Sequence, residues 1–392
     1  MQNNRREFLR NSAVLTALSS SRILGANDRV RVAGMGTGGR CQYLLGVAAK
    51  ASADIVAVCD VYEPHRLAVK EKIAPNAQAD YIDYRQVLDR KDIDAVFIGA
   101  PDHWHVRMTI DAVQAGKDVY VEKPISHSIQ EGEQVEKAVL ASKQVVQVGY
   151  QQRSWEHFQA AREWVTGGKL GKISLILVSW YQNYLGRFNP APPVETDKLE
   201  WKRFLGSAPD QPFNPLRFTN WRWFWDFGGG HLTDLYSHYC DVVQWYTNQY
   251  SPRAAQAMGG NYAIPQFECP DTINASYDYA AGFNVVYDGS LVGSLEGGNI
   301  TIHGSRALMR LSRDGVAIYP EGVVPAEKTL YPEPEIAMRS FHDGTVDHIQ
   351  NFLDCVRSRR TPNADIKSAV AAARSAHLGN LAYRRGSKVE KA

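Results

Sequence analysis

The chain has 392 residues, a formal net charge of +2 and a hydrophobic fraction of 44%. These totals are typical of an ordinary globular protein of about two domains, and no apolar run approaches the roughly 20 residues of a membrane-spanning helix. Residues 1–25 hold four arginines and one glutamate, so the formal charge without them is −1, which argues against a nucleic-acid partner.

The first 28 residues predict an export signal. The segment Asn4-Arg5-Arg6-Glu7-Phe8-Leu9-Arg10 resembles a twin-arginine signal, and a modestly apolar stretch follows at 11–19. Such signals export proteins that are already folded, so a cofactor can travel with the protein to the periplasm. Because the apolar stretch is short and no clean cleavage site follows it, a basic tail on a cytoplasmic protein is the alternative.

Residues 29–150 alternate β-rich runs with helical patterns, which predicts an α/β domain with a doubly wound parallel sheet. The expected strands are 30–34, 55–60, 95–99, 119–121 and 145–149. The expected helices begin near Arg40 or span 66–73, 84–89, 106–115 and 129–142. This order of elements predicts a domain of the Rossmann type.

A glycine-rich turn carries the cofactor prediction. Gly34-x-Gly36-x-x-Gly39 lies between the first strand and a helix, where the glycines would in order make the tight turn, admit the pyrophosphate and pack helix on strand. Asp60 ends the second strand and would bind the adenosine ribose, which favours NAD over NADP, although Arg66 lies close enough to keep NADP open. The expected cofactor contacts in this part are Gly34, Gly36, Thr37, Gly38, Gly39, Arg40 and Asp60.

Two further segments resemble the glucose–fructose oxidoreductase / inositol dehydrogenase (Gfo/Idh/MocA) family, from about residue 29 to residue 386. One runs from Pro101-Asp102-His103-Trp104-His105 to Glu122-Lys123-Pro124, and the other contains the D-x-x-x-H pair Asp234 and His238. The resemblance implies that Lys123 lies beside the nicotinamide and the substrate hydroxyl, with Asp234 and His238 as its catalytic partners. It also places Pro101, His105 and Glu122 at the cofactor.

The same resemblance implies the rest of the architecture. Residues 151–340 would form an α+β domain with an open, mostly antiparallel sheet that binds substrate and builds a dimer or tetramer. The C-terminal helices, within 341–392, would pack back on the Rossmann domain. Strand-like runs are expected at 272–279, 283–287, 291–296 and 307–312, and helices at 344–359 and 366–384, the last stopped by Gly386.

The residues themselves indicate how a secondary alcohol would be oxidised. His238 is the best proton acceptor, because the reference pKa of histidine is about 6.5. Asp234 lies one helical turn earlier and could orient the imidazole or bind a neighbouring hydroxyl, and Lys123 could share the proton. His231, Asp234 and His238 could instead share a helix face and bind zinc. The family uses no metal there, so we expect none.

Aromatic and cationic residues near this segment are the candidate substrate contacts. Trp221 and Trp223 could stack on a sugar ring or simply pack beneath the long segment 183–220. Arg153, which follows the last Rossmann strand, and Tyr236, within the D-x-x-x-H segment, are the other two candidates.

Three functions remain open at this point. The first is an oxidoreductase that acts on a sugar or cyclitol hydroxyl with a tightly held NAD, oxidising one sugar and reducing another. The second is a glycoside hydrolase or lyase that works through a transient 3-keto sugar and elimination. The third, a non-catalytic sugar sensor, is disfavoured by the complete set Lys123, Asp234 and His238.

Overall fold

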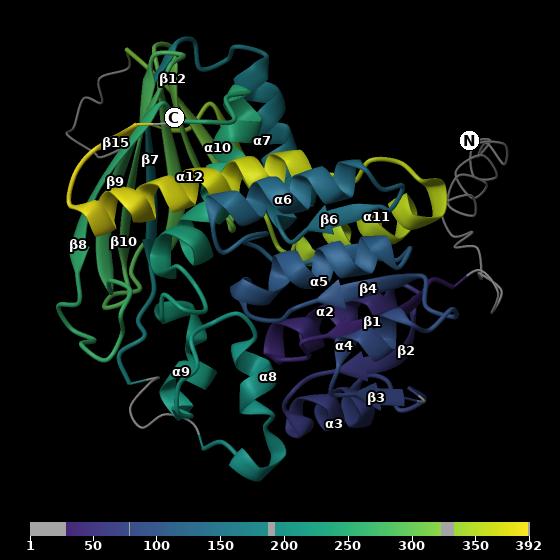
Figure 1. The fold of residues 1–392 in the computed structure, drawn as a ribbon. Coiled ribbons are helices and arrows are strands. Elements are labelled where there is room, and N and C mark those ends of the chain that lie inside the picture. Colours follow the sequence, from purple (N-terminus) through teal and green to yellow (C-terminus); the bar gives the residue numbers. More distant parts are fainter. Residues whose placement is uncertain (1–28, 78, 187–192, 323–332, 391–392) are drawn as a thin grey trace, which may run out of the picture.

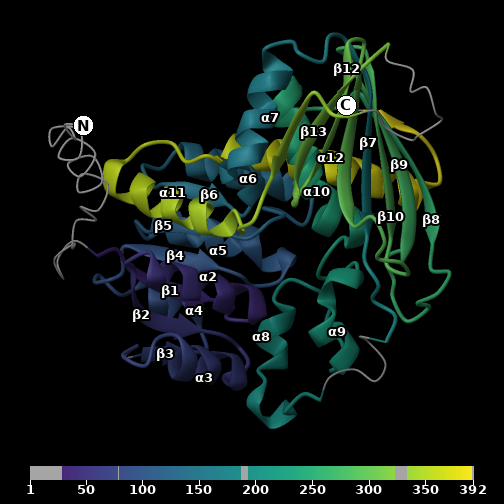
Figure 2. The same ribbon diagram turned by 180° about the vertical axis from the view of Figure 1, so that it is seen from behind.

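The computed structural model describes residues 29–77, 79–186, 193–322 and 333–390 (Figure 1). The predicted export signal lies outside the described residues. The fold contains two sheets (Figures 1 and 2). A six-stranded parallel sheet is formed by the first part of the chain, and a broader nine-stranded sheet lies at the opposite side of the molecule.

The first sheet has the predicted Rossmann topology. Its six parallel strands follow the order β3-β2-β1-β4-β5-β6, which is the doubly wound order. The strands are β1 (Arg31–Met35), β2 (Asp54–Cys59), β3 (Ala79–Tyr81), β4 (Ala95–Ile98), β5 (Asp118–Val121) and β6 (Val146–Val148). Five of them match expected strands. β3 was missed because this edge strand has three residues, none of them buried, and so carries no apolar pattern.

Helices cover both faces of this sheet. They are α2 (Gly39–Lys50), α3 (Glu63–Lys72), α4 (Tyr84–Leu88), α5 (Asp102–Gln114) and α6 (Ile129–Leu140), joined by the C-terminal α11 (Thr345–Ser358) and α12 (Ile366–Arg385). One apolar core joins the sheet to α4, α5, α6 and the first half of α12. The other core joins it to α2, α3 and α11. Both faces of the parallel sheet are thus covered by helices, as is usual for parallel sheets.

The second sheet has nine strands in the order β14-β13-β12-β11-β7-β10-β9-β8-β15. They are β7 (Ile173–Tyr181), β8 (Ala254–Gly260), β9 (Thr272–Tyr279), β10 (Phe283–Ser290), β11 (Gly298–Gly304), β12 (Ala307–Ser312), β13 (Gly315–Pro320), β14 (Ile336–Arg339) and β15 (Val389–Glu390). Every neighbouring pair is antiparallel except β7 and β10. The predicted α+β domain with a mostly antiparallel sheet is therefore confirmed.

The strand expected at 291–296 is wrong. β10 continues to Ser290, and the chain then turns, with Glu296 at φ +67° and Gly297 at φ +55°. Two successive left-handed residues cannot continue a strand. The next strand, β11, starts only at Gly298.

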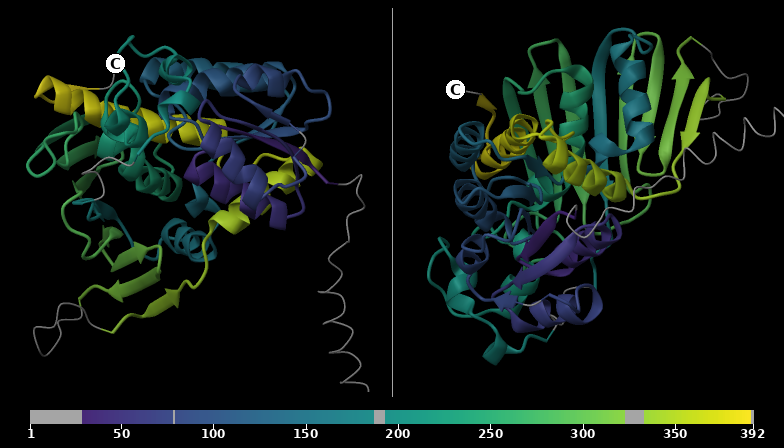
Figure 3. Two further views of the ribbon diagram at one scale, coloured as in Figure 1. Left: turned by 90° about the horizontal axis from the view of Figure 1, so that it is seen from below. Right: turned by 90° about the vertical axis from the view of Figure 1, so that its right-hand side faces the viewer.

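Helix α12 runs from one domain to the other (Figures 1 and 3). Its first half packs on the Rossmann sheet through Ile366 and Val370, and its second half packs on the core of the nine-stranded sheet through Leu378 and Ala382. Gly386 ends the helix at φ +62°, as predicted.

The remaining helices belong to the second domain. They are α7 (Glu156–Thr166), α8 (Trp201–Leu205), α9 (Pro215–Thr219), α10 (Ser237–Thr247), the short turns η2 (Gln151–Ser154), η3 (Thr196–Lys198) and η4 (Trp221–Trp223), and the π-helical turn η5 (Leu232–Tyr236). α8 lies beside the Rossmann domain near α3 (Figures 1 and 2). Phe218 of α9 stacks on His65 of α3, with 6.4 Å between ring centroids.

Candidate active site

A cavity of about 480 Å³ lies beyond the carboxyl ends of β1, β2 and β4. We call it the cofactor cavity. Among the predicted cofactor residues it is lined by Gly36, Gly38, Gly39, Asp60 and Pro101. β1 lies between β2 and β4 in the sheet, and the chain reverses its direction of winding there, which is where doubly wound sheets bind their ligands.

The roles of the three glycines in the Gly34-x-Gly36-x-x-Gly39 motif differ from those we expected. Gly36 makes the tight turn at φ +73°, and a Cβ on it would lie 2.5 Å from the Cα of Ala100. Gly34 allows helix–strand packing, because a Cβ there would lie 2.7 Å from Leu45 of α2. The packing role expected of Gly39 is wrong, since a Cβ on Gly39 would meet nothing within 4 Å.

The loop before α2 fits a pyrophosphate. Gly38 caps α2 without any side-chain hydrogen bond, so the N–H groups of the first turn have no side-chain acceptor. The hydroxyl of Thr37 is buried and has no hydrogen-bond partner among the described residues. Free N–H groups at a helix N-terminus and an unused hydroxyl are the donors that phosphate oxygens need.

The end of β2 fits an adenosine ribose without a 2′-phosphate. The Asp60 carboxylate accepts the N–H of Tyr62 at 2.9 Å and lies 3.2 Å from the His65 ring nitrogen. Arg66, which had kept NADP open, is buried and donates to the backbone carbonyl of Asp60 at 2.6 Å. It does not line the cofactor cavity, whereas the acid does.

A second cavity of about 360 Å³ adjoins the first, and we call it the site cavity. The two cavities share Gly99, Ala100, Thr219, Trp221 and Arg222 in their walls. The structure brings all three predicted catalytic residues, Lys123, Asp234 and His238, into the site cavity. Three of the predicted cofactor residues, Arg40, His105 and Glu122, line the same cavity.

Lys123 and Asp234 form the centre of the site. Lys123 follows β5, and its Nζ donates to Asp234 Oδ1 and to the Asp234 backbone carbonyl, both at 2.6 Å. Arg222 Nε donates to the same Oδ1 at 3.2 Å. Burial raises the pKa of the Asp234 carboxyl, but the charges of Lys123 and Arg222 outweigh burial and bring the pKa below its ordinary value. An ammonium has three donors, so the two bonds to Asp234 leave one for a ligand.

Arg40 and Glu122, both predicted at the cofactor, pair with each other. Arg40 Nε donates to Glu122 Oε1 at 2.8 Å across the space between α2 and β5. Burial raises the pKa of the Glu122 carboxyl, yet Arg40 and Lys123 lower it further, so the net pKa lies below the ordinary value. Glu122 is therefore ionised beside Lys123.

His238 lies in the first turn of α10, and its imidazole is neutral. Its ring stacks on Trp180 with 5.7 Å between centroids and meets the edge of Tyr150 at 6.2 Å. Burial and the nearby charges of Lys123 and Arg313 hold its pKa well below the ordinary value. Its Nδ1 is buried without a hydrogen-bond partner among the described residues.

Asp234 does not orient His238, contrary to one of our expectations. The segment Leu232–Tyr236 is π-helical rather than α-helical, so a spacing of four residues no longer stacks the two side chains one above the other. The Asp234 carboxylate is instead used by Lys123 and Arg222.

Asp102 is a buried acid at this site that the sequence analysis did not single out. It opens α5 and is 3% exposed. Burial raises the pKa of its carboxyl well above the ordinary value, Lys123 lowers it in part, and Asp234 raises it again. The signal for it was its place directly after Pro101 in the motif.

Two predicted substrate contacts are wrong. The Arg153 guanidinium forms a bidentate pair with Asp241 at 2.8–3.0 Å; both residues are buried and neither lines the site cavity. Tyr236 is 0% exposed, and its ring stacks on Tyr277 at 4.7 Å, inside the core of the second domain. A π-helical turn and a buried ion pair leave no mark on the local sequence pattern.

Trp221, Trp223 and His105 line the site cavity. The Arg222 guanidinium lies over the Trp221 ring, with its carbon 4.2 Å from the ring centroid. Trp223 is 2% exposed and stacks on Phe267. His105 is buried with Nδ1 at 2.6 Å from the Pro124 carbonyl and Nε2 at 2.7 Å from the Ala100 carbonyl. Its ring therefore fixes the loops after β4 and β5.

The alternative metal site does not form. The His231 ring turns away from the site, with Nδ1 at 3.0 Å from the Tyr287 hydroxyl and Nε2 at 3.0 Å from the Asp271 carbonyl. Within the described ranges, no three His, Cys, Asp or Glu side chains are grouped to hold a metal ion. Nor does any helix in those ranges have the length and apolarity to cross a membrane.

Several further residues that line the site cavity were missed, among them the polar and aromatic side chains of Gln151, Trp180, Gln182 and Arg313. Gln151 lies in η2, Trp180 and Gln182 lie at the end of β7, and Arg313 lies in the turn between β12 and β13. Each is far in sequence from the motifs, and only the tertiary fold brings them to Lys123.

Comparison with known proteins agrees with this geometry. Residues 29–150 match the family model described as "Oxidoreductase family, NAD-binding Rossmann fold", and residues 158–310 match the "GFO/IDH/MocA C-terminal domain". Among curated proteins, the uncharacterized oxidoreductase YrbE of Bacillus subtilis is 35% identical over 27% of this chain and 32% of its own length. The scyllo-inositol 2-dehydrogenase (NAD(+)) of the same organism is 24% identical over 71% of each chain.

Solved structures share the whole fold. Levoglucosan dehydrogenase in complex with NADH and levoglucosan superimposes with a TM-score of 0.72 at 17% identity, covering 92% of this chain and 99% of that one. The aldose-aldose oxidoreductase from Caulobacter crescentus gives 0.71 at 18% identity, covering 93% and 100%. The aligned part spans only about a third of YrbE, but the two family models together span well over half of this chain. The chain therefore belongs to the Gfo/Idh/MocA oxidoreductase family, with residues 29–150 as its NAD-binding Rossmann domain.

Proposed function

We propose that the protein oxidises a secondary hydroxyl of a sugar or cyclitol with NAD. The observation that carries this proposal is the meeting of Lys123, Asp234 and neutral His238 in one cavity that opens into the cofactor cavity. The relatives whose names include inositol, levoglucosan and aldose substrates support the same substrate class.

The side chains divide the proton chemistry between them. Asp234 holds Lys123 by two hydrogen bonds, which leaves the third N–H to donate to the substrate oxygen and to stabilise negative charge on it. His238 is neutral and accepts the hydroxyl proton. NAD, when bound by the glycine-rich loop and Asp60, supplies the hydride acceptor.

We also propose that the protein is exported by the twin-arginine route with NAD already bound. The supporting observations are Arg5-Arg6 in the sequence and the similarity to a protein named an aldose-aldose oxidoreductase. Outside the cytoplasm no nicotinamide pool can exchange with the enzyme. A resident cofactor must then be reduced by one sugar and reoxidised by another.

The test uses the purified full-length chain. Mass spectrometry of the denatured protein should release one NAD(H) per chain, and a panel of sugars and cyclitols should convert the bound cofactor to its reduced, ultraviolet-absorbing form. Lys123→Met and His238→Ala should each slow this reduction by about 10²- to 10⁴-fold while the NAD content stays unchanged.

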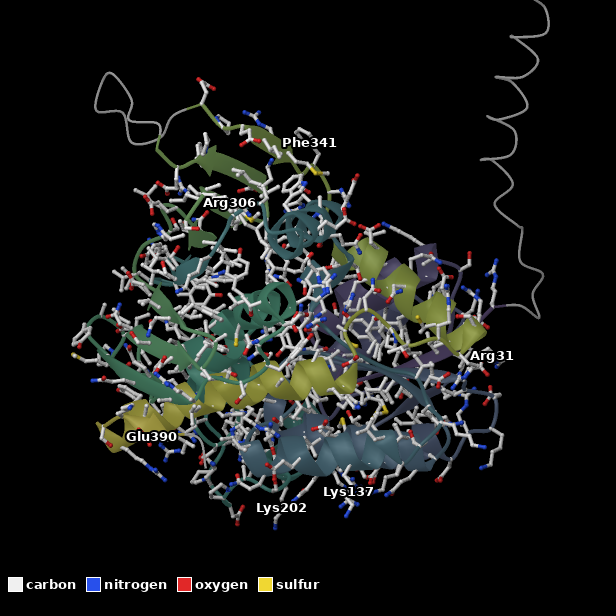
Figure 4. All side chains as sticks on the ribbon, turned by 90° about the horizontal axis from the view of Figure 1, so that it is seen from above. Arg31, Lys137, Lys202, Arg306, Phe341 and Glu390 are labelled. Atoms are coloured by element: carbon white, nitrogen blue, oxygen red, sulfur yellow. The ribbon has the colours of Figure 1, made fainter. Side chains whose placement is uncertain are left out.

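Lys137→Met is the matched control, because Lys137 is exposed on α6 at the outer edge of the molecule (Figure 4). It should keep full activity. If Lys123→Met and His238→Ala both reduce the cofactor at the wild-type rate, the assignment of these residues to catalysis is wrong. Release of p-nitrophenol from a p-nitrophenyl glycoside without a lasting change in the cofactor would overturn net oxidation in favour of glycoside cleavage.

We further propose a homo-oligomer built through the outer face of the nine-stranded sheet. On β7, Ile176 and Val178 are buried at 0% and 1% exposure, so Leu177, at 39%, faces the other way. Pairing across the sheet places Met258, at 74% exposure, on the same outer face. Apolar side chains on an uncovered sheet face are typical of an interface.

Light scattering tests this interface. Leu177→Asp should lower the molar mass to that of one chain, because a carboxylate would be buried in the interface. Leu140→Asp, on α6 and 55% exposed, is the matched control and should leave the mass unchanged. A monomeric wild type, or an unchanged mass in Leu177→Asp, contradicts the proposal.

A further inference from the structure

The charges in the site cavity do not balance. Six charged side chains line it: Arg40, Glu122, Lys123, Arg222, Asp234 and Arg313. Arg40 pairs with Glu122, while Lys123 and Arg222 share Asp234. These two clusters already use both acids of the lining, so the charge of Arg313 has no counterpart in the cavity wall.

Arg313 is held in place by an aromatic ring rather than by an acid. It lies in the tight turn between β12 and β13, with its guanidinium carbon 5.0 Å from the Trp180 ring centroid. The same Trp180 ring stacks on His238, so Arg313 belongs to the wall that carries the proton acceptor. Across the described ranges it forms no ion pair, and its Nε is buried without a hydrogen-bond partner.

An unpaired, partly desolvated guanidinium is unfavourable unless a ligand supplies the missing acceptors. Neutral hydroxyls satisfy hydrogen bonds but leave the charge unbalanced. A carboxylate matches both the charge and the planar fork of one guanidinium.

Two amide oxygens in the same cavity fit the rest of a sugar. Gln151 Oε1 and Gln182 Oε1 are buried, line the site cavity and accept no hydrogen bond from the described residues. Amide oxygens accept hydrogen bonds from hydroxyl groups. The unused groups of the wall are therefore two hydroxyl acceptors and one anion receptor.

We propose that the substrate is a sugar acid, a polyhydroxylated ring with a carboxylate that binds Arg313. This inference rests on the proposed oxidoreductase function and narrows its substrate class. Arg313 binds the carboxylate at the Trp180 wall, the two glutamines accept ring hydroxyls, and the hydroxyl to be oxidised lies at Lys123 and His238.

The experiment compares each hexuronate with the hexose that carries a hydroxymethyl group in place of the carboxylate. The pairs are D-glucuronate with D-glucose, D-galacturonate with D-galactose, and D-mannuronate with D-mannose. Calorimetry on the NAD-loaded full-length protein measures binding without requiring turnover. We expect at least one acid to bind roughly tenfold or more tightly than its hexose, which is the range of one charged hydrogen-bonded pair.

Arg313→Ala should abolish that preference, and Arg339→Ala should keep it. Arg339 is a matched control because it is exposed on β14, where it pairs with Gly315 next to the Arg313 turn, and does not line the cavity. Equal binding of acids and hexoses by the wild type overturns the proposal, as does a preference that survives in Arg313→Ala. If hexose 6-phosphates bind through Arg313 and hexuronates do not, the proposal that the ligand of Arg313 is a carboxylate is wrong.

Cofactor reduction by the same sugars separates the two proposals. If neutral sugars reduce the cofactor and no acid is preferred, the sugar-acid inference fails while the oxidoreductase function stands. If an acid binds through Arg313 yet neither it nor any other sugar reduces the cofactor, the oxidoreductase function fails.

Discussion

Arg153 and Arg313 carry the same side chain, and their neighbours give them opposite roles. Arg153 lies within 3.0 Å of both oxygens of Asp241, in a region where both residues are buried. Its charge is therefore neutralised inside the protein, and it positions η2 against α10. Arg313 meets Trp180 instead of an acid and keeps its charge for a ligand.

Removing Arg153 should destabilise the protein without weakening substrate binding. Arg153→Ala leaves the Asp241 carboxylate buried and unpaired, so we expect the free energy of unfolding to fall by about 3–5 kcal/mol. Urea unfolding measures this loss, and calorimetry on the remaining folded protein should give an unchanged substrate dissociation constant. The double variant Arg153→Met/Asp241→Leu should recover part of the stability. Full stability with weakened substrate binding in Arg153→Ala would restore the substrate role that we have rejected.

At the scale of elements, the turn between β1 and α2 shows why similar residues are not equivalent. Gly36 and Gly39 belong to one motif, yet only Gly36 has a left-handed φ and a neighbouring backbone within 2.5 Å of a hypothetical Cβ. Gly36 also donates its N–H to the Cys59 carbonyl at 2.8 Å, which ties the turn to the end of β2 and so to Asp60.

Gly36→Ala should therefore lose NAD, whereas Gly39→Ala should retain it. The added methyl group at residue 36 must displace Ala100, which lines both cavities, so we expect NAD affinity to fall by roughly tenfold or more and stability to fall by about 1–3 kcal/mol. NAD content after purification and thermal unfolding measure the two effects. Comparable NAD loss in the two variants would mean that the space around Gly36 is not what limits binding.

Elements with a clear apolar pattern could be predicted from the sequence, and elements without one could not. β9, β12, α11 and α12 were predicted within two residues of their observed ends, since their apolar residues recur with a regular period. β3 is as short as β6 but has no buried residue and so no apolar pattern, and the π-helical turn η5 has the composition of an ordinary helix. Lys123, Asp234 and His238 follow from motifs, whereas Arg313 and the Arg153–Asp241 pair depend on contacts between distant segments that no local pattern encodes.

At the scale of the whole molecule, α12 joins the two halves of the site. His377 bonds to the Ser126 carbonyl of the Rossmann domain at 2.9 Å, and Asn380 donates to the Gly229 carbonyl before the catalytic turn at 2.9 Å. Between them, Gly379 packs so closely that a Cβ there would lie 2.7 Å from Leu232 of η5. The helix thereby fixes Asp234 relative to Lys123, although it contributes no residue to the cavity lining.

Buried neutral histidines spread over both domains should make the fold sensitive to mild acid. Burial lowers the pKa of His103, His231, His348 and His377 to about 4. The unfolded chain binds the same protons near pH 6.5, so between about pH 6.5 and 4 unfolding takes up protons and stability falls as the pH falls. Within this range each histidine contributes about 1 kcal/mol per pH unit to the slope. Above pH 6.5 the histidine is neutral in both states, so its contribution to the slope disappears and the loss of stability is absent.

Thermal unfolding across this pH range, compared between variants, isolates the effect of one histidine from that of the carboxylates. His377→Gln can keep the hydrogen bond to the Ser126 carbonyl but cannot titrate, so the stability of this variant should fall less steeply between pH 6.5 and 4. His342→Gln is the control, because His342 is half-exposed, pairs with Asp347 at the surface and lies outside the buried set; the slope of this variant should match that of the wild type. If His377→Gln kept the wild-type slope, the acid sensitivity would have to come from groups other than the histidines that pack the two domains together.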